Sequence, residues 1–420
     1  AGGGAGAAGA AGRSSRDAGA GSDADASPTT DASSGEGGAE PDAHVTVRCD
    51  SGLSPEMARF ETTISLMPTV AVVVPPDANV GVGVVSAELS RDGSVVSGGY
   101  IAAFKVHPRF GPIYGAAPLL HWFRWSGSDF EDLGLPAEDI AGVPAALDCT
   151  GDTIAGNLST SVPSTDFAGE WTLVQTALAR WTRAGGFETL PPASAAVPTD
   201  ESFAAVNAIT ADGTTVLGYY VDYVNGRQFT ERWVGTRPAE VLPASSSFVP
   251  GFDADGHVRY GSSPNGAAVW VGDAPPMYVT APDAQFITLT GLSAEGVYVV
   301  GTDNEVDGGK KGFIWSASTG MQSLGEVEPS AVSRDGRVVV GTRAGAATDT
   351  DFVWDRAHGV RSLRTILTTA GLSINAGWTI QSVSGVSDDG RVLVGILQNR
   401  STMPYQLAAF RAVVPANAFE

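Results

Sequence analysis

The stretch AVSRDGRVVVG, residues 331 to 341, occurs seven times in this chain with small changes. The other copies are ELSRDGSVVSG (88–98), ALDCTGDTIAG (146–156), AITADGTTVLG (208–218), GFDADGHVRYG (251–261), GLSAEGVYVVG (291–301) and GVSDDGRVLVG (385–395). Their turn glycines are 58, 62, 43, 40, 40 and 54 residues apart. A unit of about 40 residues with insertions explains these spacings, so the chain is a repeat protein.

Each copy has the pattern of two β-strands joined by a tight turn. A small apolar run precedes the turn, which begins with Ser, Thr or Asp, usually carries an acid before its glycine, and leads into a valine-rich run. These are the preferences of a type I turn followed by a left-handed residue, a conformation that glycine adopts without steric cost. The acids are therefore predicted to form turns, because separate turns around a ring lie too far apart for paired carboxylates.

Two further phrases follow each copy and complete the unit. The second phrase ends at one repeat position, with tryptophan in six units and arginine in the seventh: Trp125, Trp181, Trp233, Trp270, Trp315, Trp354 and Arg411. Six of the nine tryptophans thus share one position, which indicates a packing role. A third phrase, such as QSLG ending at 325, usually comes soon after. Each unit is therefore predicted to form four short antiparallel strands.

Seven such units predict an all-β fold, a β-propeller of seven four-stranded blades. The last unit lacks a fourth strand, whereas the apolar run TVAVVVPP (69–76) precedes the first unit. If this run completes the seventh blade, the ring closes without an open sheet edge. Strand-like segments within 44–68 leave six or eight blades as alternatives. The expected division is a disordered tether at 1–43, a connecting arm at 44–68, the propeller at 69–415 and a tail at 416–420.

The first 43 residues contain no Val, Ile, Leu, Phe, Tyr or Trp, so they cannot offset the entropy of ordering. The sequence starts without Met, which fits an exported precursor trimmed after its signal sequence, although a shortened chain would look the same. A net charge of -21 disfavours nucleic acid and anionic membranes as partners. No run of 18 apolar residues occurs, so we expect no transmembrane segment. We expect a monomer, with tethering to the envelope through the N-terminus as an option.

The phrases SxDGxVVVG, AFxW and GMxSLG resemble the HAF repeat of bacterial extracellular β-propeller proteins. The closing stretch, from SLRTILTTAG at 362 to AAFRAVVP at 415, resembles the final blade of that family. The resemblance covers about residues 66–415 and is loosest in units 2 and 4, where Thr150 replaces the turn acid of unit 2. It implies secretion or surface display, in the extracellular space or cell envelope of a bacterium, and it brings no established catalytic residues.

Motifs that carry chemistry are few. The five histidines are scattered, and neither HExxH nor GxSxG occurs. The loop TDNEVDGGKKG (302–312) holds Asp303, Glu305 and Asp307 at the alternate spacing with which calcium loops begin. The twelfth position from Asp303 is Ile314, so the closing carboxylate of an EF-hand is absent. We interpret the segment as a solvated acidic loop, with calcium binding as the alternative, and expect no other cofactor.

The chain has two cysteines, Cys49 and Cys149. In an exported protein such a pair indicates one disulfide, and in a cytosolic protein two thiols. The sequence leaves both open. A disulfide would fasten the arm before the propeller to the turn of unit 2, because Cys149 lies in that turn.

Three insertions interrupt the repeats and are the best candidates for a binding surface. Connections between the second and third strands are short in units 3 to 7, but they run over 99–121 in unit 1 and 157–177 in unit 2. The third insertion, 364–383, joins units 6 and 7. Because connections in an antiparallel meander alternate faces, all three are expected on one face. Their aromatic and basic residues predict a recognition surface, with packing onto the blades as the alternative: Phe104, Lys105, His107, Arg109, Phe110, Tyr114, Phe167, Trp171 and Trp378.

These observations favour a non-enzymatic, exported or surface-tethered propeller that binds a protein or glycan partner. The alternatives are a propeller hydrolase or lyase acting on an extracellular polymer, and a structural spacer of the envelope. An enzyme should gather acids, a base or a metal near the propeller axis. The repeated positions supply no such set, and the fold alone does not decide between the alternatives.

Overall fold

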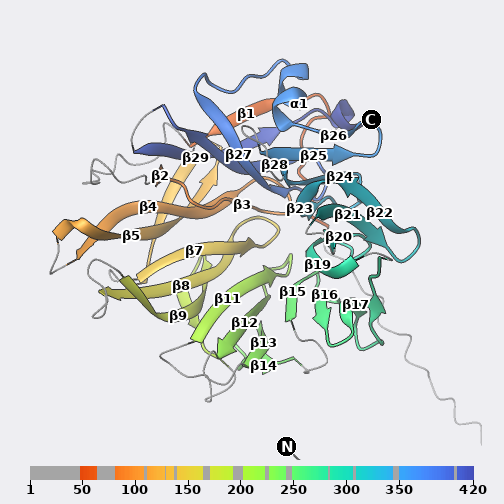
Figure 1. Cartoon of the computed structure of the whole chain (residues 1–420). Helices are drawn as coiled ribbons and strands as arrows, with labels where there is room; N and C mark the ends of the chain where they lie inside the picture. The colour runs from red at the N-terminus through yellow and green to blue at the C-terminus, as the bar shows by residue number, and fades with distance from the viewer. Residues whose placement is uncertain are drawn as a thin grey trace, which may run out of the picture. The chain divides into compact units, whose positions relative to one another are not determined.

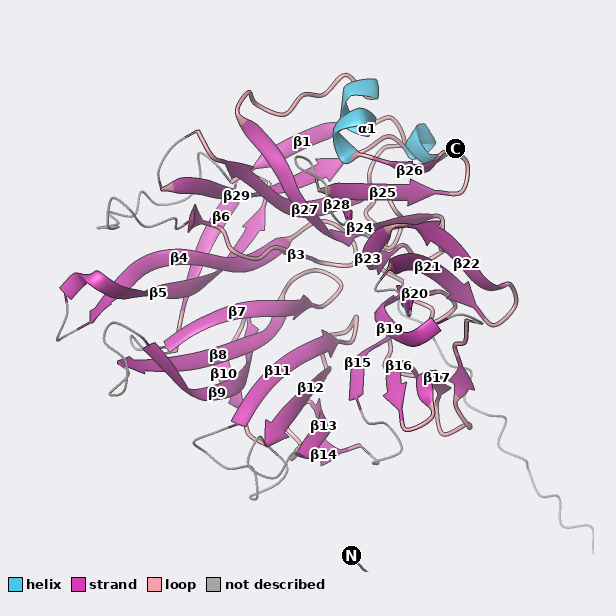
Figure 2. Ribbon diagram, viewed as in Figure 1, coloured by secondary structure: helices cyan, strands magenta, loops and turns pink. Residues whose placement is uncertain are grey.

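The computed structural model describes residues 48–63, 81–107, 111–127, 129–136, 140–163, 171–192, 202–222, 227–242, 248–281, 284–305, 309–343, 350–401 and 404–420. The tether predicted at 1–43 lies outside these residues. Antiparallel sheets follow one another along the chain as the seven blades of a β-propeller, as the repeat predicts (Figure 1). The described part of the chain is almost entirely strand and turn (Figure 2), with one short α-helix, α1 (Leu363–Thr369), and one 3-10 helix, η1 (Ala416–Phe419).

Blades 1 to 6 each hold four strands that we name A to D in chain order, because each strand pairs with the next one along the chain. Blades 1 to 3 are β3 (Glu88–Leu89), β4 (Val96–His107), β5 (Gly111–Ser126) and β6 (Asp129–Gly134); β7 (Ile140–Leu147), β8 (Thr153–Pro163), β9 (Trp171–Thr182) and β10 (Gly186–Leu190); β11 (Ser202–Ile209), β12 (Thr215–Asp222), β13 (Arg227–Val234) and β14 (Glu240–Val241). Blades 4 to 6 are β15 (Phe248–Phe252), β16 (Val258–Ser263), β17 (Gly266–Val271) and β18 (Met277–Tyr278); β19 (Ala284–Leu292), β20 (Val299–Glu305), β21 (Lys310–Ser316) and β22 (Gly320–Gly325); β23 (Val327–Val332), β24 (Val338–Arg343), β25 (Asp351–Asp355) and β26 (Gly359–Arg361). Blade 7 has β27 (Trp378–Val386), β28 (Val392–Asn399) and β29 (Tyr405–Val413).

Blade 7 is completed by two strands from the N-terminal region, β1 (Arg59–Thr62) and β2 (Gly81–Gly83). β1 pairs antiparallel with the end of β29, and β2 pairs parallel with its beginning. Closure by an N-terminal strand is thus confirmed, but the strand differs from the expected one. Residues 69–76 lie outside the described residues, whereas β1 belongs to 44–68, the segment that the sequence pattern assigns to a connecting arm. At least part of that segment is therefore propeller.

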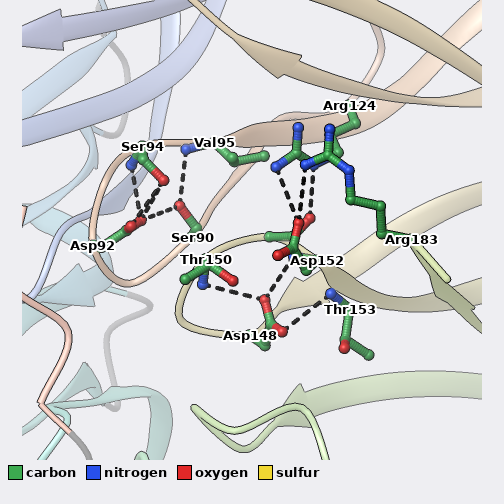
Figure 3. Close-up of polar contacts among 11 residues, drawn as sticks. Ser90, Asp92, Ser94, Val95, Arg124, Asp148, Thr150, Asp152, Thr153 and Arg183 are labelled. Carbon is green, nitrogen blue, oxygen red and sulfur yellow. Dashed lines mark hydrogen bonds and ion pairs between the residues drawn. The ribbon is translucent and has the colours of Figure 1, made fainter.

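The turn between strands A and B is held by its serine and its aspartate, as predicted. In blade 1, Asp92 Oδ1 accepts hydrogen bonds from the backbone N–H of Ser94 (2.9 Å) and from the Ser90 hydroxyl (2.7 Å) (Figure 3). The Ser90 oxygen in turn accepts one from the N–H of Val95 at 2.9 Å. Gly93 follows with a φ of 75°, a conformation that favours glycine. The turn aspartate is thus fully engaged in holding the turn.

Blade 2 keeps the turn although Thr150 replaces the acid. Asp148 stands at the serine position, and its carboxylate accepts hydrogen bonds from the backbone N–H groups of Thr150 (3.3 Å), Asp152 (3.0 Å) and Thr153 (3.1 Å) (Figure 3). A carboxylate has enough lone pairs to cap several donors at once. The loss of one turn acid is therefore compensated by a second acid two residues earlier.

Blade 4 has acids at both of these turn positions, Asp253 and Asp255. Burial, together with the charge of Asp255, raises the pKa of Asp253 above its ordinary value. A group whose pKa is raised on folding contributes stability at low pH that is lost as the pH rises. We therefore expect Asp253→Ser, which restores the serine of blades 5 to 7, to raise the free energy of unfolding at pH 8 by about 1 kcal/mol. The gain should shrink at pH 5, and urea denaturation at both pH values measures it.

The matched control for this prediction is Asp148→Ser. A serine hydroxyl cannot replace a carboxylate that caps three backbone N–H groups, so this variant should be less stable than the wild type at pH 5. The deficit should be smaller at pH 8, because burial also raises the pKa of Asp148. A loss of stability in Asp253→Ser at pH 8 would contradict the prediction.

The valine run after the turn forms a strand that is covered on both faces, as its composition predicts. Val338, Val339 and Val340 are at most 2% exposed. The glycine that ends the run is required by a close approach of strand A. A Cβ at Gly341 would lie 2.1 Å from the carbonyl oxygen of Glu328, beside a bulge in strand A.

The tryptophan position is buried in five blades and half-buried at Trp315. In blade 7 the strand register corrects the sequence alignment. Ala412 lies opposite Leu393, as Trp315 lies opposite Val299 in blade 5. The residue at the tryptophan position is therefore Ala412, and Arg411 belongs one position earlier.

Arg411 joins blade 7 to blade 1 by a hydrogen bond that also occurs between blades 1 and 2. Its Nε donates to the backbone carbonyl of Gly93 in blade 1 (2.7 Å), just as Arg124 Nε of blade 1 donates to that of Gly151 in blade 2 (2.8 Å). Both arginines are buried, so these charge-assisted hydrogen bonds are shielded from water. The junction of the last and first blades is thus built like an internal one.

Candidate functional site

A cavity of about 290 Å³ lies on the propeller axis, where the A strands of all seven blades meet. One repeat position, two residues before the first turn residue, contributes to its wall in every blade. That position is small in six blades and a glutamate in one: Ala146, Ala208, Gly251, Gly291, Ala331, Gly385 and Glu88. Only blade 1 therefore adds a carboxyl group at this level of the cavity.

The Glu88 carboxyl has no hydrogen-bond or ion-pair partner among the described residues. Its side chain is half-buried in the cavity wall. The surrounding protein desolvates the carboxyl and raises its pKa from 4.5 to about 8, and no charged neighbour contributes to the shift. Desolvation disfavours the charged form of an acid, so this group is largely protonated at neutral pH. The repeat alignment could have revealed Glu88 from the sequence, because it is the exception at an otherwise small position.

The other polar groups of the wall are used to join the blades. Thr290 Oγ1 donates to the carbonyl of Pro329 (2.7 Å), Ser330 Oγ to that of Val383 (3.1 Å), and Ser384 Oγ to that of Ala87 (2.6 Å). The first two bonds link strand A of one blade to strand A of the next, and the third links strand A of blade 7 to the residue just before strand A of blade 1. These hydroxyl groups hold the wall together and are not left unpaired for a ligand.

The end of the cavity at the A–B turns is closed by the N-terminal segment. We call this side of the propeller the turn face. Cys49 is 1% exposed and packs among Ala211, Ala254 and Ala294, which follow the first residue of three turns. A disulfide joins it to Cys149, the same turn residue of blade 2, with a Cα–Cα distance of 5.6 Å. The bond ties the segment before β1 to blade 2, where the sequence analysis placed it for the paired case.

Charged residues surround this closure. Arg334 donates to Asp50 (3.0 Å), to the Cys49 carbonyl (3.3 Å) and to Asp388 (3.1 Å), and Arg91 lies 3.9 Å from Asp388. Burial alone would lower the pKa of Arg334, but its bonds to Asp50 and Asp388 raise it above the ordinary value. Burial raises the pKa of Asp388, although Arg91 and Arg334 oppose the rise. The charged side chains at the turn face are thus paired with one another, and they hold the N-terminal segment in place.

The opposite side, which we call the loop face, carries two long hairpins. β4 and β5 have 12 and 16 residues, and β8 and β9 have 11 and 12, against 6 and 5 in β24 and β25. At about 3.3 Å per residue, each hairpin reaches roughly 15–20 Å beyond its blade. The segments 99–121 and 157–177, expected as B–C loops, are thus mostly strand, because the ladder continues to the pair His107 and Gly111 in blade 1.

The β4–β5 hairpin becomes a two-stranded ribbon at its outer end (Figure 1), because the inner edge of β4 is paired no farther than Tyr100. In the β8–β9 hairpin, β7 pairs with β8 as far as Thr160, so only its last residues are two-stranded. β6 pairs with β5 no farther than Trp122, and β10 pairs with β9 no farther than Leu178. Beyond these points the outer edges of β5 and β9 have no strand partner among the described residues. Unpaired strand edges present backbone donors and acceptors to a partner.

The structure places the predicted binding residues unevenly. The backbones of Phe104, Lys105 and His107 lie in β4, that of Tyr114 in β5 and that of Trp171 at the start of β9. The Phe104 side chain is half-buried. Arg109, Phe110 and Phe167 lie outside the described residues.

Trp378 is 8% exposed and belongs to the core of blade 7. The insertion 364–383 forms α1 and the start of β27, and α1 buries Leu363, Ile366 and Leu367 in the same core. For this insertion the packing alternative holds, because its apolar residues cover the blade. Trp378 is therefore not part of an exposed surface.

The acidic segment predicted as a loop starts within β20. Asp303 pairs with Lys311 across the β20–β21 ladder, and Glu305 ends the strand. Asp307 lies outside the described residues. Among the residues whose side chains are described, no group of three or more His, Cys, Asp or Glu side chains is placed to hold a metal ion. Neither described helix has the length and apolar composition of a membrane span.

No family model matches the chain, and no curated protein matches it. Among solved structures, TolB from Acinetobacter baumannii is 16% identical with a TM-score of 0.41, over 65% of this chain and 63% of that chain. Porphyromonas gingivalis dipeptidyl peptidase 4 is 12% identical with a TM-score of 0.40, over 77% of this chain and 51% of that one. A chain of a mitotic checkpoint complex is 12% identical with a TM-score of 0.43, over 89% and 96%. The chain thus spans about two thirds or less of the length of the first two proteins. TM-scores and identities this low indicate neither a family nor a function for this chain.

Proposed function

We propose that this chain is an exported or surface-displayed β-propeller that binds a protein or glycan partner on its loop face and performs no catalysis. The observation that carries the proposal is the pair of ribbons formed by β4–β5 and β8–β9, which extend from neighbouring blades. Their strand edges fit an extended peptide segment, which a sheet edge binds through main-chain hydrogen bonds. The turn face, in contrast, is occupied by the chain's own N-terminal segment.

Three features support export. A disulfide forms and persists in oxidising compartments, and one joins Cys49 to Cys149. The strong negative charge favours solubility outside the cell over binding to anionic surfaces. The resemblance of the repeat phrases to the HAF repeat points to the same bacterial extracellular setting. We propose membership in that family on these phrases.

The test is to shorten the longer ribbon, β4–β5, without touching the blades. Replacing residues 104–118 by an Asn-Gly turn joins Ala103 to Leu119, which already face each other in the ladder. We expect the shortened protein to keep the thermal stability of the wild type and to lose at least tenfold in affinity for partners found on protein and glycan arrays. Tyr114→Ala and Trp171→Ala test the side chains alone.

The matched control changes exposed apolar residues away from the ribbons, at the outer strand of blade 4, as Met277→Ser with Tyr278→Ser. Unchanged binding by the shortened protein would refute the β4–β5 ribbon as the binding site, and unchanged binding by Trp171→Ala as well would refute the ribbon proposal. Turnover of an extracellular polysaccharide or peptide by the wild type would instead favour the hydrolase or lyase.

A further inference from the structure

The axial cavity contains a carboxyl group, that of Glu88, which has no partner among the described residues and which the blade architecture does not need. The fold needs only a residue that packs well at the repeat position of Glu88. Six of the seven blades have Ala or Gly there. A glutamate there adds a half-buried carboxyl group to the cavity wall, and partial removal of such a group from water without a partner costs stability. A costly group that the fold does not need is a candidate for function.

Among the described residues, no neighbouring side chain in the cavity wall supplies a positive charge or a hydrogen bond to the Glu88 carboxyl. The described residues that line the cavity include two further charged side chains, Arg91 and Asp388, both at the turn-face end. These two form an ion pair of 3.9 Å with each other, and Arg334 adds a second bond to Asp388. Tyr260, the remaining titratable group of the wall, donates its hydroxyl to the Thr290 carbonyl at 3.1 Å, and burial raises its pKa.

The cavity has room for a small molecule. At about 30 Å³ per water, a volume of 290 Å³ corresponds to roughly ten non-hydrogen atoms. Cys49 packs among three turn alanines at the turn face, so we expect a ligand to enter from the loop face. The net charge of -21 raises the local concentration of cations around the protein.

We infer that the axial cavity is a binding site for a small organic ammonium ion, whose charge is neutralised by the Glu88 carboxylate. An ammonium group supplies the hydrogen-bond donors and the positive charge that the carboxylate lacks in the unliganded protein. This site is independent of the ribbon surface proposed above, because it involves none of the ribbon residues.

Binding is coupled to release of the Glu88 proton. Because the carboxyl has a pKa of about 8 in the unliganded protein, an ammonium ion must displace a proton below that pH and meets a free carboxylate above it. The apparent affinity should therefore fall about tenfold for each pH unit below 8. Between pH 9 and pH 6 the expected loss is roughly 100-fold.

The experiment is calorimetric titration of the whole chain with butylammonium, 1,4-diaminobutane and tetramethylammonium at pH 6, 7.5 and 9, with butanol and butyrate as neutral and anionic analogues. We expect at least one of the three cations to bind at pH 9 and to weaken towards pH 6. Titrations at pH 7 in buffers of different ionisation heat should show the release of nearly one proton per bound cation. The two analogues should not bind.

Glu88→Gln keeps the size of the side chain and should abolish cation binding, whereas Glu131→Gln, which alters an exposed acid on β6, should leave it unchanged. The inference is overturned if none of the three cations binds at pH 9, if butanol binds as tightly as butylammonium, or if Glu88→Gln retains the affinity. Loss of ribbon binding would leave these results unaffected, so the two proposals fail separately.

Discussion

Glu88→Gln should make the protein more stable at pH 8.5 and leave its stability nearly unchanged at pH 4.5. The folded protein holds the Glu88 proton up to a pH of about 8, whereas the unfolded chain releases it near 4.5. Between these values the folded state carries the additional proton, so the free energy of unfolding falls as the pH rises. Glutamine is a neutral isostere and does not take part in this loss.

A shift of this size corresponds to a difference of about 2–4 kcal/mol at pH 8.5, allowing for water in the cavity. The measurement is urea denaturation of both proteins at pH 4.5, 6.5 and 8.5, with the difference taken at each pH so that the other titrating groups cancel. Glu131→Gln provides the matched control at an exposed position. A difference between Glu88→Gln and wild type that stays constant across this range would show that Glu88 does not titrate in an enclosed site.

The fold was predictable because the sequence pattern of one blade occurs seven times. The Ser-x-Asp-Gly turn, the buried valines and the tryptophan position each have a physical reason that recurs in every blade, and the hydrogen bonds of Ser90 and Asp92 show the turn chemistry that the residue types predict. Errors arose where a unit departs from the pattern. Arg411 was misaligned by one residue because blade 7 has Ala412 in place of the tryptophan.

The closing strands were harder to predict, because no repeat signal marks them. β1 is only four residues long, RFET, and its partner β29 lies about 350 residues away in the sequence. The apolar run 69–76 was the stronger strand candidate by composition, but pairing at a sheet edge depends on three-dimensional proximity. Local sequence does not encode that proximity.

The site was only partly predictable for a related reason. The insertions stood out because they interrupt the period, yet length alone did not show that two of them continue as paired strands while the third folds as α1 over the core. Trp378 was expected on a surface because its insertion is long, whereas α1 covers it. Glu88 lies four residues before the turn acid Asp92 and resembles an ordinary strand residue until all seven repeats are aligned.

Removal of the disulfide has the second large expected effect. We expect Cys49→Ser to lower the free energy of unfolding by about 2–4 kcal/mol, because the Cys49–Cys149 bond spans 100 residues and restricts the unfolded chain. Part of the loss arises in the folded state, since Cys49 fills the turn-face end of the cavity among three alanines. Arg334 and Arg391 also hold this segment through the carbonyls of Cys49 and Leu53, at 3.3 and 2.9 Å, so the segment should stay partly attached.

Guanidinium denaturation with and without dithiothreitol measures the effect. The wild type should lose stability on reduction, and Cys49→Ser should be insensitive to the reductant. Cys149→Ser distinguishes the two contributions, because it breaks the same bond but leaves the Cys49 side chain able to fill the cavity end. It should therefore be no less stable than Cys49→Ser. Mass spectrometry of the unreduced wild type should show the Cys49 and Cys149 peptides linked, and two free thiols together with a reductant-insensitive transition would refute the pairing.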